Sequence, residues 1–412
     1  MLVIGTALVA VSNSDGDTVR HFEPSAIAHR IGSFSRRVVI GALLMAGAIA
    51  HAELFVSVQD GKQMSIGGAV KVVDGQDTLA IVELVSGKLI LRDEIAVPAS
   101  VIGPPTSVAV TPDGALALVT AGFKRDPADS GKVVQNDQVT VVDLTSRPPR
   151  IIDTLKVGKG PTGVSINRQG TLALIANHDD GTVSVLSIAG LKVTVIEPVR
   201  VGDAAAGLMH VAITPDGKRA LVSREGDHRI TVLAIDAMKV TTTARDLFAG
   251  QRPDCIDIRS QGDLAVVANV GRGQGDSDTV SLIDLSVEPP RVVDTISVGQ
   301  TPESAFFSPD GRYIGVNVID GSNKPVGSPF YNATGRFVLL RVEGKTLLRV
   351  ASAPIGSWSQ GMAFSAQGRE VIIQNSAEKQ LQVLSISNER ISDTGQKLQL
   401  NAAPAAMRSI SH

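Results

Sequence analysis

The sequence predicts an all-β fold assembled from a repeated unit of about 50 residues, and three observations lead to this prediction. First, the 412 residues include 40 glycines and 20 prolines but only 3% aromatic side chains, a composition typical of many short strands joined by tight turns. Second, one strand pattern recurs seven times. Third, a turn ending in glycine precedes most of these strands. One large repetitive structure is therefore expected rather than several unrelated domains.

The recurring strand alternates apolar and polar positions, as in Val139-Thr140-Val141-Val142-Asp143-Leu144, which is the period of a half-buried β-strand. Its first and last copies, near Leu79 and Leu381, lie 302 residues apart, so the six intervals average about 50 residues. The seven copies span residues 78–84, 139–144, 183–188, 230–235, 280–285, 337–342 and 381–386.

Six four-residue turns end in glycine and separate two apolar strands; they are residues 111–114, 167–170, 214–217, 259–262, 308–311 and 365–368. In the Pro-Asp-Gly examples proline presets φ, aspartate caps its own backbone and glycine takes the positive φ, so each turn closes a hairpin. A further strand follows the recurring one, as at Arg150–Leu155. Four antiparallel strands in each of seven repeats predict a seven-bladed β-propeller with four-stranded antiparallel blades.

Only six glycine turns accompany seven recurring strands, so one innermost strand is missing from the regular order. Residues 403–410 resemble the first strand of a repeat and are expected to supply it. The first blade would then combine residues 53–97 with residues 403–410, and the C-terminal strand would close the ring without a free sheet edge. Residues 53–412 are therefore predicted to form a single propeller domain.

The segment Ser35–Ala52 has the features of a secretory signal peptide. Arg36 and Arg37 precede a mostly apolar run, and Ala50-His51-Ala52 is a small-x-small cleavage site. We expect residues 1–52 to be a leader that is cleaved after Ala52, with the mature chain in the periplasm or secreted. A buried helix is the alternative, and the sequence leaves Sec and twin-arginine export open. The apolar run is too short to span a bilayer permanently, so no transmembrane anchor is expected in the mature chain.

Charge and cysteine content exclude several classes of function. The 39 basic and 41 acidic side chains nearly balance, which argues against nucleic acid as a partner. Cys255 is the single cysteine, so no intramolecular disulfide or cysteine-based metal site can form. The sequence has no H-E-x-x-H or C-x-x-C-H motif, and neither a metal nor a cofactor is predicted. Cys255 lies within an apolar strand and is expected to be a core residue rather than a nucleophile.

A family resemblance rests on the Gly-x-Pro loops, the Ser/Thr-Pro-Asp-Gly turns and apolar strands that end in asparagine, such as Leu174–Asn177 and Val266–Asn269. Together these motifs resemble the YVTN-repeat propellers, which overlap the lactonase-like seven-bladed superfamily, over roughly residues 53–410. The resemblance implies an exported binding or scaffold protein, with lactone hydrolysis or lyase chemistry in some relatives. Each strand-ending asparagine is expected to hydrogen-bond the loop that it opens.

Propeller geometry places the loops before each innermost strand and after each second strand on one face, opposite the glycine turns. Four of these loops are long, at residues 60–77, 121–137, 270–278 and 318–336, whereas the turns on the other face keep four residues. Loops carry binding and catalytic residues more often than the sheets that support them. This loop-rich face is therefore the expected functional face.

Polar residues mapped to the loop-rich face form the candidate site. His210, Asp254 and Glu303 are candidate catalytic residues, because a histidine beside a carboxylate can act as a general base on a carbonyl substrate. The candidate binding residues are His178, His228, Arg224, Arg252, Trp358 and Gln360, and either arginine could stabilise developing negative charge.

Two functions follow from these observations. The first is an exported binding or scaffold protein that recognises a small molecule or an unidentified periplasmic protein through the loop-rich face. The second is a lactonase-like carbonyl hydrolase, or a lyase, that acts at the mouth of the central channel. The enzyme hypothesis requires His210, Asp254 or Glu303 to converge in a pocket that fits a small molecule.

Overall fold

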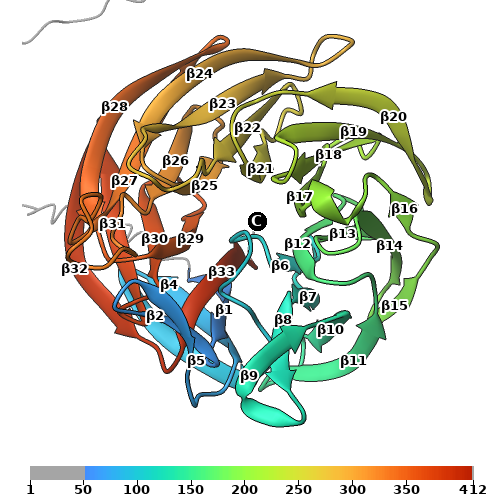
Figure 1. The fold of residues 1–412 in the computed structure, drawn as a ribbon, viewed down its shortest axis with the longest axis horizontal. Coiled ribbons are helices and arrows are strands. Elements are labelled where there is room, and N and C mark those ends of the chain that lie inside the picture. The colour runs from blue at the N-terminus through green and yellow to red at the C-terminus, as the bar shows by residue number, and fades with distance from the viewer. Residues whose placement is uncertain (1–51, 411–412) are drawn as a thin grey trace, which may run out of the picture. The chain divides into compact units, whose positions relative to one another are not determined.

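The fold is a ring of seven four-stranded antiparallel sheets around a central channel, in a computed structural model that describes residues 52–410 (Figure 1). Within these residues there is no α-helix, and the one helical element is a short 3-10 turn, η1 (Ala204–Ala206). The predicted seven-bladed propeller is therefore confirmed. The predicted signal segment lies outside the described residues, apart from its last residue, Ala52.

From the innermost strand outward, the blades are as follows: blade 1, β33 (Ala403–Ser409), β1 (Glu53–Asp60), β4 (Thr78–Val85) and β5 (Lys88–Ala96); blade 2, β6 (Val108–Val110), β7 (Leu116–Thr120), β10 (Gln138–Asp143) and β11 (Arg150–Lys156); blade 3, β12 (Pro161–Ile166), β13 (Leu172–Asn177), β14 (Thr182–Ala189) and, as outer strand, β15 (Lys192–Val195) with β16 (Val199–Arg200); blade 4, β17 (Leu208–Ile213), β18 (Arg219–Arg224), β19 (Arg229–Asp236) and β20 (Lys239–Leu247). The remaining three are blade 5, β21 (Pro253–Ile258), β22 (Leu264–Asn269), β23 (Asp278–Asp284) and β24 (Arg291–Gly299); blade 6, β25 (Pro302–Phe307), β26 (Tyr313–Val318), β27 (Gly335–Glu343) and β28 (Thr346–Ile355); and blade 7, β29 (Ser359–Phe364), β30 (Glu370–Asn375), β31 (Gln380–Ser387) and β32 (Arg390–Gln399). The seven recurring strands of the sequence are the third strands of these blades.

The C-terminal strand closes the ring as predicted. β33 pairs antiparallel with β1, from Phe55 opposite Ser409 to Asp60 opposite Ala403, with one bulge between Val58 and Gln59. Gln374 of blade 7 also donates to the Ala406 carbonyl at 2.9 Å, which joins the last blade to the closing strand. The first blade thus holds both ends of the propeller together.

The glycine turns and the packing between blades explain why this sequence folds as a propeller. In the first turn Gly114 has a φ of 68°, and its N–H donates to the Thr111 carbonyl at 2.8 Å. Alternate strand residues are buried between neighbouring blades; Val280 and Val338, for example, belong to one cluster that joins blades 5 and 6. Cys255 is fully buried in the same cluster, so its prediction as a core residue is confirmed.

The strand-ending asparagines do not bond mainly to the loops that they open, contrary to expectation, because their amides reach the next strand. Asn177 donates to Thr182 Oγ1 at 2.9 Å and to Ser184 Oγ at 2.8 Å on the next strand of its own blade. Asn317 differs, because its amide donates to the Gln360 carbonyl at 3.0 Å in the neighbouring blade. The asparagines therefore act in the scaffold.

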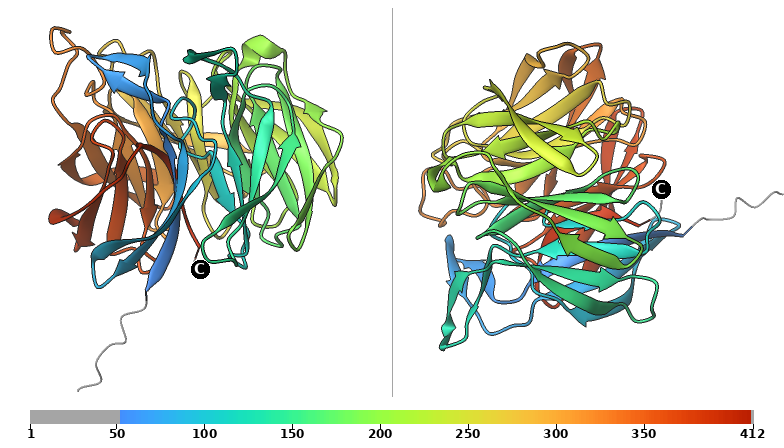
Figure 2. Two further views of the ribbon diagram at one scale, coloured as in Figure 1. Left: turned by 90° about the horizontal axis from the view of Figure 1, so that it is seen from below. Right: turned by 90° about the vertical axis from the view of Figure 1, so that its right-hand side faces the viewer.

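Two of the long loops form hairpins that project from the loop-rich face. They are β2 (Gln63–Ile66) with β3 (Ala69–Val72), and β8 (Phe123–Asp126) with β9 (Asp129–Gln135). Figure 2 shows both hairpins at the top of its left view, whereas the C-terminal end of the chain lies at the bottom. The two ends of the channel are therefore built from different parts of the repeat.

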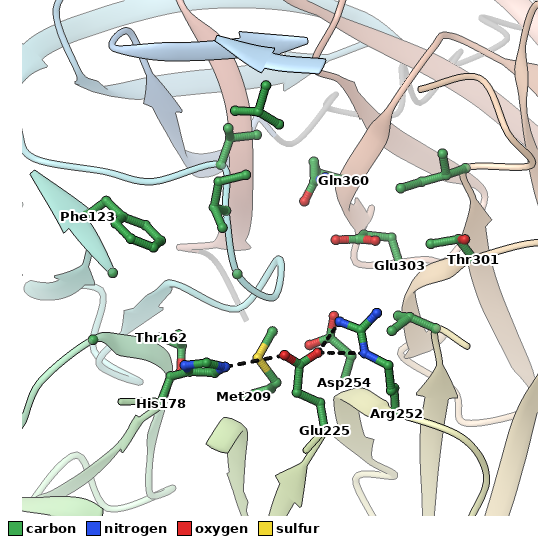
Figure 3. A pocket seen from close by; sticks show the side chains of 18 of the residues that line it. Phe123, Thr162, His178, Met209, Glu225, Arg252, Asp254, Thr301, Glu303 and Gln360 are labelled. Atoms are coloured by element: carbon green, nitrogen blue, oxygen red, sulfur yellow. Dashed lines mark hydrogen bonds and ion pairs between the residues drawn. The ribbon is translucent and has the colours of Figure 1, made fainter. Parts of the chain in front are cut away.

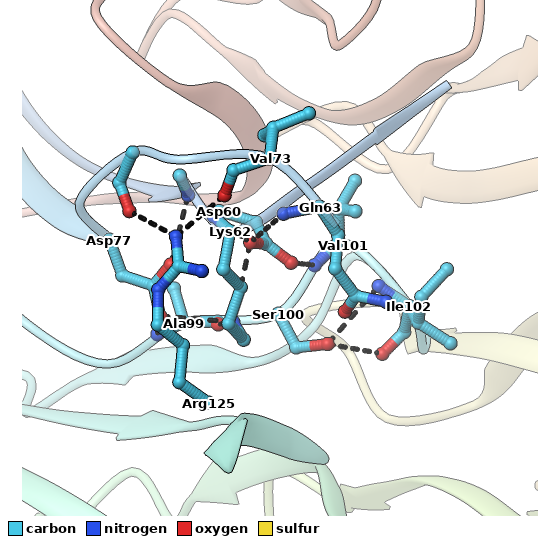
Figure 4. Close-up of polar contacts among 12 residues, drawn as sticks. Asp60, Lys62, Gln63, Val73, Asp77, Ala99, Ser100, Val101, Ile102 and Arg125 are labelled. Atoms are coloured by element: carbon cyan, nitrogen blue, oxygen red, sulfur yellow. Dashed lines mark hydrogen bonds and ion pairs between the residues drawn. The ribbon is translucent and has the colours of Figure 1, made fainter. Parts of the chain in front are cut away.

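A buried ion cluster fixes the first of these loops (Figure 4). Lys62 Nζ lies 2.9 Å from Asp77 Oδ2 and 3.3 Å from Asp60 Oδ1, and the Lys62 side chain is only 2% exposed. The other oxygen of Asp60 accepts from the Val101 N–H at 2.9 Å. Asp60 thereby ties the loop to the segment that enters blade 2.

Arg125 connects the two hairpins to each other. Its guanidinium donates to the Val73 carbonyl at 2.6 Å and to the Gly75 carbonyl at 2.8 Å (Figure 4). Asp60 and Arg125 together hold the first long loop in place, and this loop forms part of the wall at the mouth of the channel.

Candidate active site at the mouth of the channel

A cavity of about 410 Å³ occupies the loop-rich end of the channel. Part of its wall is apolar and comes from the hairpins and neighbouring loops: Val70, Val101, Ile102, Phe123, Val270 and Ile319. The opposite part is polar and includes His178, Glu225, Arg252, Asp254 and Glu303 (Figure 3). A concave site with an apolar wall and a few convergent polar groups is typical of small-molecule binding.

One ring of the lining comes from the innermost strands. In blades 3 to 7 the second residue of the innermost strand (β12, β17, β21, β25 and β29) lines the cavity; these residues are Thr162, Met209, Asp254, Glu303 and Gln360. Because the blades are equivalent, one repeat position places all five side chains at the same height. Asp254 and Glu303 therefore come from neighbouring blades and face the same space (Figure 3).

A second ring comes from the residues that directly follow each second strand. His178 follows β13, Glu225 follows β18, Val270 follows β22 and Ile319 follows β26, and all four line the cavity. The chemistry of this ring changes from polar in blades 3 and 4 to apolar in blades 5 and 6. A bound molecule would therefore meet a charged side and an apolar side.

In blades 3 to 7 the residue immediately before the innermost strand has a left-handed backbone conformation. Gly160 and Gly207 occupy this position in blades 3 and 4 with φ of 64° and 56°. Arg252, Thr301 and Trp358 adopt the same left-handed conformation, with φ of 53°, 57° and 50°. This region is unfavourable for side chains other than glycine, most of all for a β-branched threonine. Three non-glycine residues held there, all lining the cavity, point to a functional use of their side chains.

A chain of polar contacts crosses the charged side of the cavity (Figure 3). His178 Nδ1 lies 2.7 Å from Asp179 Oδ1, and its Nε2 lies 3.3 Å from Glu225 Oε1. The other carboxylate oxygen of Glu225 accepts from Arg252 Nε at 3.1 Å and from Arg252 Nη2. Arg252 Nη1 donates to the Gly271 carbonyl at 3.2 Å. These contacts fix the guanidinium plane at the edge of the cavity.

Charge pairing shifts the pKa values of His178 and Glu225 toward their ionised forms. The hydrogen bond to Glu225 raises the pKa of His178, and Asp179 acts in the same direction against the effect of burial. Burial disfavours the Glu225 carboxylate, but His178 and Arg252 outweigh it and lower the pKa of Glu225. In this network each contact thus favours the charged form of its partner.

The two carboxyl groups of the innermost ring are shifted in the opposite direction. Burial raises the pKa of Asp254 well above its usual range, and the charges of Glu303 and Glu225 raise it further. Burial also raises the pKa of Glu303, to about 7, although Arg252 acts against this shift. Glu303 therefore exchanges its proton near neutral pH, and the raised pKa of Asp254 favours its protonated form. A carboxyl group that titrates near neutrality can act as a general acid or base.

Gln360 of blade 7 orients Glu303, and Trp358 holds Gln360 in turn. With the Gln360 amide turned so that its nitrogen faces blade 6, that nitrogen donates to Glu303 Oε1 at 3.2 Å and the amide oxygen accepts from Trp358 Nε1 at 3.0 Å. Asp254 Oδ1, by contrast, is buried without a hydrogen-bond partner within residues 52–410. Glu303 is consequently fixed in place, while Asp254 keeps a free position for a bound molecule.

The structure brings together six of the nine predicted site residues. His178, Arg252, Asp254, Glu303, Trp358 and Gln360 line the cavity. His210 does not, contrary to its expected convergence with the carboxylates, because it is the third residue of β17 and neighbouring side chains of a strand point to opposite sides. It lines a different cavity, at the glycine-turn end of the channel. Burial lowers the pKa of His210 to about 3, which keeps it neutral.

His228 and Arg224 also lie outside the cavity, and both have local structural contacts. His228 Nδ1 accepts from the backbone N–H of Arg252 at 3.2 Å, so it positions the arginine that lines the site. Arg224 contacts Asp227 and donates to Thr231 Oγ1 at 3.0 Å within blade 4. A direct role for Arg224 in binding at the channel mouth is not supported by this placement.

Sequence reasoning missed Glu225, which connects His178 to Arg252. A signal was present, because Glu225 occupies the same repeat position as His178, directly after the second strand of its blade. The apolar residues of the first two hairpins were missed as well, since they belong to no repeat.

Among residues 52–410 no group of three or more histidine, cysteine, aspartate or glutamate side chains is arranged to hold a metal ion. The same residues include no helix with the length and apolar character needed to cross a membrane.

Fold and site together define a seven-bladed propeller with a polar cavity at one channel mouth, and solved structures share this architecture. Similar structures include a candidate 6-phosphogluconolactonase from Bacteroides fragilis (16% identity, 87% of this chain and 98% of that chain, TM-score 0.67). They also include the periplasmic gluconolactonase of Pseudomonas aeruginosa (16% identity, 88% and 99%, TM-score 0.65). The hydrazine synthase of Kuenenia stuttgartiensis is similar over 70% of this chain and 78% of its own (21% identity, TM-score 0.54). No protein-family model matches the sequence, and no curated protein matches it.

These similarities support a lactonase-like propeller fold. They do not extend to membership of the YVTN-repeat family. At such identities the similarity concerns the fold, and function must be argued from the site.

Proposed function

We propose that the protein is a hydrolase that opens a small lactone in the cavity at the loop-rich end of the channel. One observation carries the proposal: two carboxyl groups of raised pKa, the buried Asp254 and the partly buried Glu303, face the same cavity as Arg252. The fold shared with structures described as lactonases supports this choice over a binding scaffold.

Hydrolysis of a lactone needs a base for the attacking water, a positive group for the oxyanion and a proton for the leaving oxygen. Glu303 supplies the base, because it loses its proton near pH 7 and Gln360 orients it. It takes one proton from water as the oxygen attacks the carbonyl carbon. When the ring C–O bond breaks, the same proton passes to the leaving alkoxide, which gives a hydroxy acid.

Arg252 and Asp254 are placed to stabilise the oxyanion. A guanidinium has five N–H groups, and in Arg252 three of them are used by Glu225 and Gly271. The others remain for a substrate oxygen. Protonated Asp254 can donate one more hydrogen bond through its unpaired oxygen. His228 and Glu225 act as positioning residues for Arg252.

The charges of the cavity favour a neutral substrate. Asp179 and Glu225 already pair with His178 and Arg252, and Glu303 adds a negative charge when it ionises near pH 7. A phosphorylated lactone would bring two further negative charges to this site. The apolar wall suits a carbon substituent on the ring. We therefore infer that the substrate is an unphosphorylated lactone.

The proposal is tested by assaying purified protein with δ-gluconolactone, δ-decalactone and 6-phosphogluconolactone in a pH-stat. We expect hydrolysis of an uncharged lactone, a lower kcat/KM for the phosphorylated one, and a loss of about a hundredfold or more in kcat for Glu303→Gln. Glu288→Gln, at an exposed position between β23 and β24 that does not line the cavity, serves as the matched control. An unchanged rate in Glu303→Gln, or no hydrolysis of any lactone by the wild type, would refute the proposal.

Binding of a protein partner by the loop-rich face is a second candidate. It is favoured by exposed apolar side chains on two long loops, Ile66 and Val70 on the first and Val326 and Phe330 on the last. Replacing Ile66, Val326 and Phe330 by serine, with Val70 kept because it lines the cavity, should abolish capture of a partner from periplasmic extract while lactone hydrolysis by Glu303 persists. Undiminished capture would exclude this surface.

Export is proposed from the sequence of the leader. The signal peptide Ser35–Ala52 predicts a mature chain that starts at Glu53 in the periplasm or outside the cell. N-terminal sequencing of the protein recovered from a periplasmic fraction tests this directly, and an intact leader on that protein would contradict it.

A further inference from the structure

The opposite end of the channel holds a second cavity, of about 370 Å³. All seven innermost strands contribute to its wall, and none of its lining residues belongs to the cavity at the loop-rich end. Most of this wall is apolar, with Val110, Ile166, Ile213, Ile258, Phe306 and Phe364 around it. A cavity of this size and character can enclose a small organic molecule.

Arg408 of the closing strand β33 lines this cavity with part of its guanidinium unused. Its Nη1 donates to the Met407 carbonyl at 2.8 Å, and the guanidinium carbon lies 4.9 Å from the centroid of the Phe306 ring. No aspartate or glutamate among residues 52–410 lies within ion-pair distance of it. Stacking on Phe306 thus holds a positive charge in place without neutralising it.

Asp257 of β21 lines the same cavity and is held in a comparable way. Its Oδ2 accepts from the Phe307 N–H at 2.8 Å, and no basic side chain of the described chain forms an ion pair with it. Burial raises the pKa of Asp257 to about 6, while the Phe307 N–H and the charge of Arg408 act in the opposite direction. At neutral pH the group is therefore mostly a carboxylate.

The third titratable group in the wall, His210 of β17, adds no charge, because burial lowers its pKa to about 3. The cavity consequently presents one cation and one anion that are too far apart to pair with each other. Each of them alone would repel a ligand of its own sign. A molecule that carries both charges on an apolar body satisfies both groups at once.

We propose that this cavity binds a free amino acid with an apolar side chain, whose carboxylate meets Arg408, whose ammonium group meets Asp257 and whose side chain contacts the apolar wall. An arginine fork matches the two oxygens of a carboxylate, and a buried carboxylate is a strong acceptor for an ammonium group. The site is independent of the proposed lactone hydrolysis, since the two cavities share no residue.

The experiment is isothermal titration calorimetry of the purified protein with L-leucine and its two truncated analogues. 4-Methylpentanoate lacks the ammonium group, and 3-methylbutylamine lacks the carboxylate. We expect saturable binding of leucine, with both analogues at least about tenfold weaker. No saturable leucine binding, or 4-methylpentanoate bound as tightly as leucine, overturns the proposal, and this comparison needs no variant.

Variants then locate the site. Arg408→Gln and Asp257→Asn should each weaken leucine binding by about tenfold or more, whereas Arg408→Lys should lose less than Arg408→Gln. Arg390→Gln, an exposed arginine on the outer strand β32, is the matched control and should bind as the wild type does. Leucine binding that survives Arg408→Gln in a cooperatively folded protein places the ligand elsewhere and overturns the assignment.

Discussion

Glu225 holds Arg252 through one carboxylate oxygen, which accepts from both Nε, at 3.1 Å, and Nη2 of the guanidinium. The other oxygen of Glu225 faces His178 Nε2 at 3.3 Å. One carboxylate thus links an imidazole and a guanidinium from different blades, and it sets the direction of the only arginine that lines the cavity within the described residues.

Glu225→Gln should lower kcat/KM for lactone hydrolysis by about tenfold, because Arg252 loses its ionic anchor. The negative charge of Glu225 also raises the pKa of Glu303. Its removal should therefore lower that pKa and move the acidic limb of the pH–rate profile to lower pH. Glu389→Gln, a glutamate that pairs with Arg341 on the outer part of the ring, should leave the profile in place. A shift toward higher pH in Glu225→Gln would contradict the proposed role.

Arg252→Gln should have the opposite effect on the profile. The charge of Arg252 lowers the pKa of Glu303, so its loss should raise that pKa and move the acidic limb to higher pH. The loss of an oxyanion donor should also reduce kcat by about a hundredfold. Parallel pH–rate profiles of the two variants measure both shifts, and movement in the same direction would exclude Glu303 as the titrating base.

Glu303→Gln should stabilise the folded protein at neutral pH even though it abolishes hydrolysis. The pKa of Glu303 is raised from 4.5 to about 7 in the folded state, so its contribution to stability is complete below about pH 4.5 and is lost as pH rises through about 7. A neutral glutamine removes this loss. We expect the Tm of the variant to exceed that of the wild type by a few degrees at pH 8 and to equal it at pH 4.5. A lower Tm at pH 8 would be inconsistent with the raised pKa.

The two histidines of the channel should titrate far apart. The hydrogen bond to Glu225 raises the pKa of His178, and burial lowers the pKa of His210 to about 3. In NMR spectra of histidine-labelled protein, His178 should change protonation above pH 6.5, whereas His210 should stay neutral throughout the range from pH 8 to 4. Spectra of His178→Asn and His210→Gln assign the signals. A His210 signal that titrates near pH 6.5 would show that the site is solvated.

Asp60→Ala should destabilise the fold by about 3–5 kcal/mol, because it leaves the buried Lys62 ammonium without one of its two carboxylates. Thermal unfolding measures the change. Asp74→Ala, in an exposed part of the same loop, should stay within about 0.5 kcal/mol of the wild type. Since Asp60 also accepts from the Val101 N–H, the KM for the lactone should rise in the first variant alone. Equal stability of both variants would show that the cluster does not anchor the loop.

The sequence predicted the ring well because its determinants are local and repeated. Period-two strands and glycine turns specify each hairpin, and a count of seven strands against six turns was enough to assign the closing role of residues 403–410. The same regularity placed Asp254 and Glu303 at one height in the channel. Both features depend on contacts between residues that are close in sequence or equivalent between repeats.

The features that the sequence did not predict depend on the direction of side chains along a strand and on contacts between residues far apart in sequence. His210 is one residue further along its strand than the lining position held by Met209, and this single step turns its side chain toward the other end of the channel. Arg125 reaches Val73 across 52 positions of sequence, a contact that no repeat pattern encodes. The pattern of residues 403–410 predicts a closing strand but gives no sign that the guanidinium of Arg408 lines the channel.

The pairing of β33 with β1 has a consequence for biosynthesis. β33 is the last strand of the ring to leave the ribosome, and it completes the sheet that began to form with the first. Until it docks, blade 1 lacks its inner edge and the channel lacks Arg408. Docking of β33 therefore closes the ring and brings Arg408 into the second cavity in one step. A nascent chain that stops short of this strand forms an open ring and lacks the proposed amino acid site.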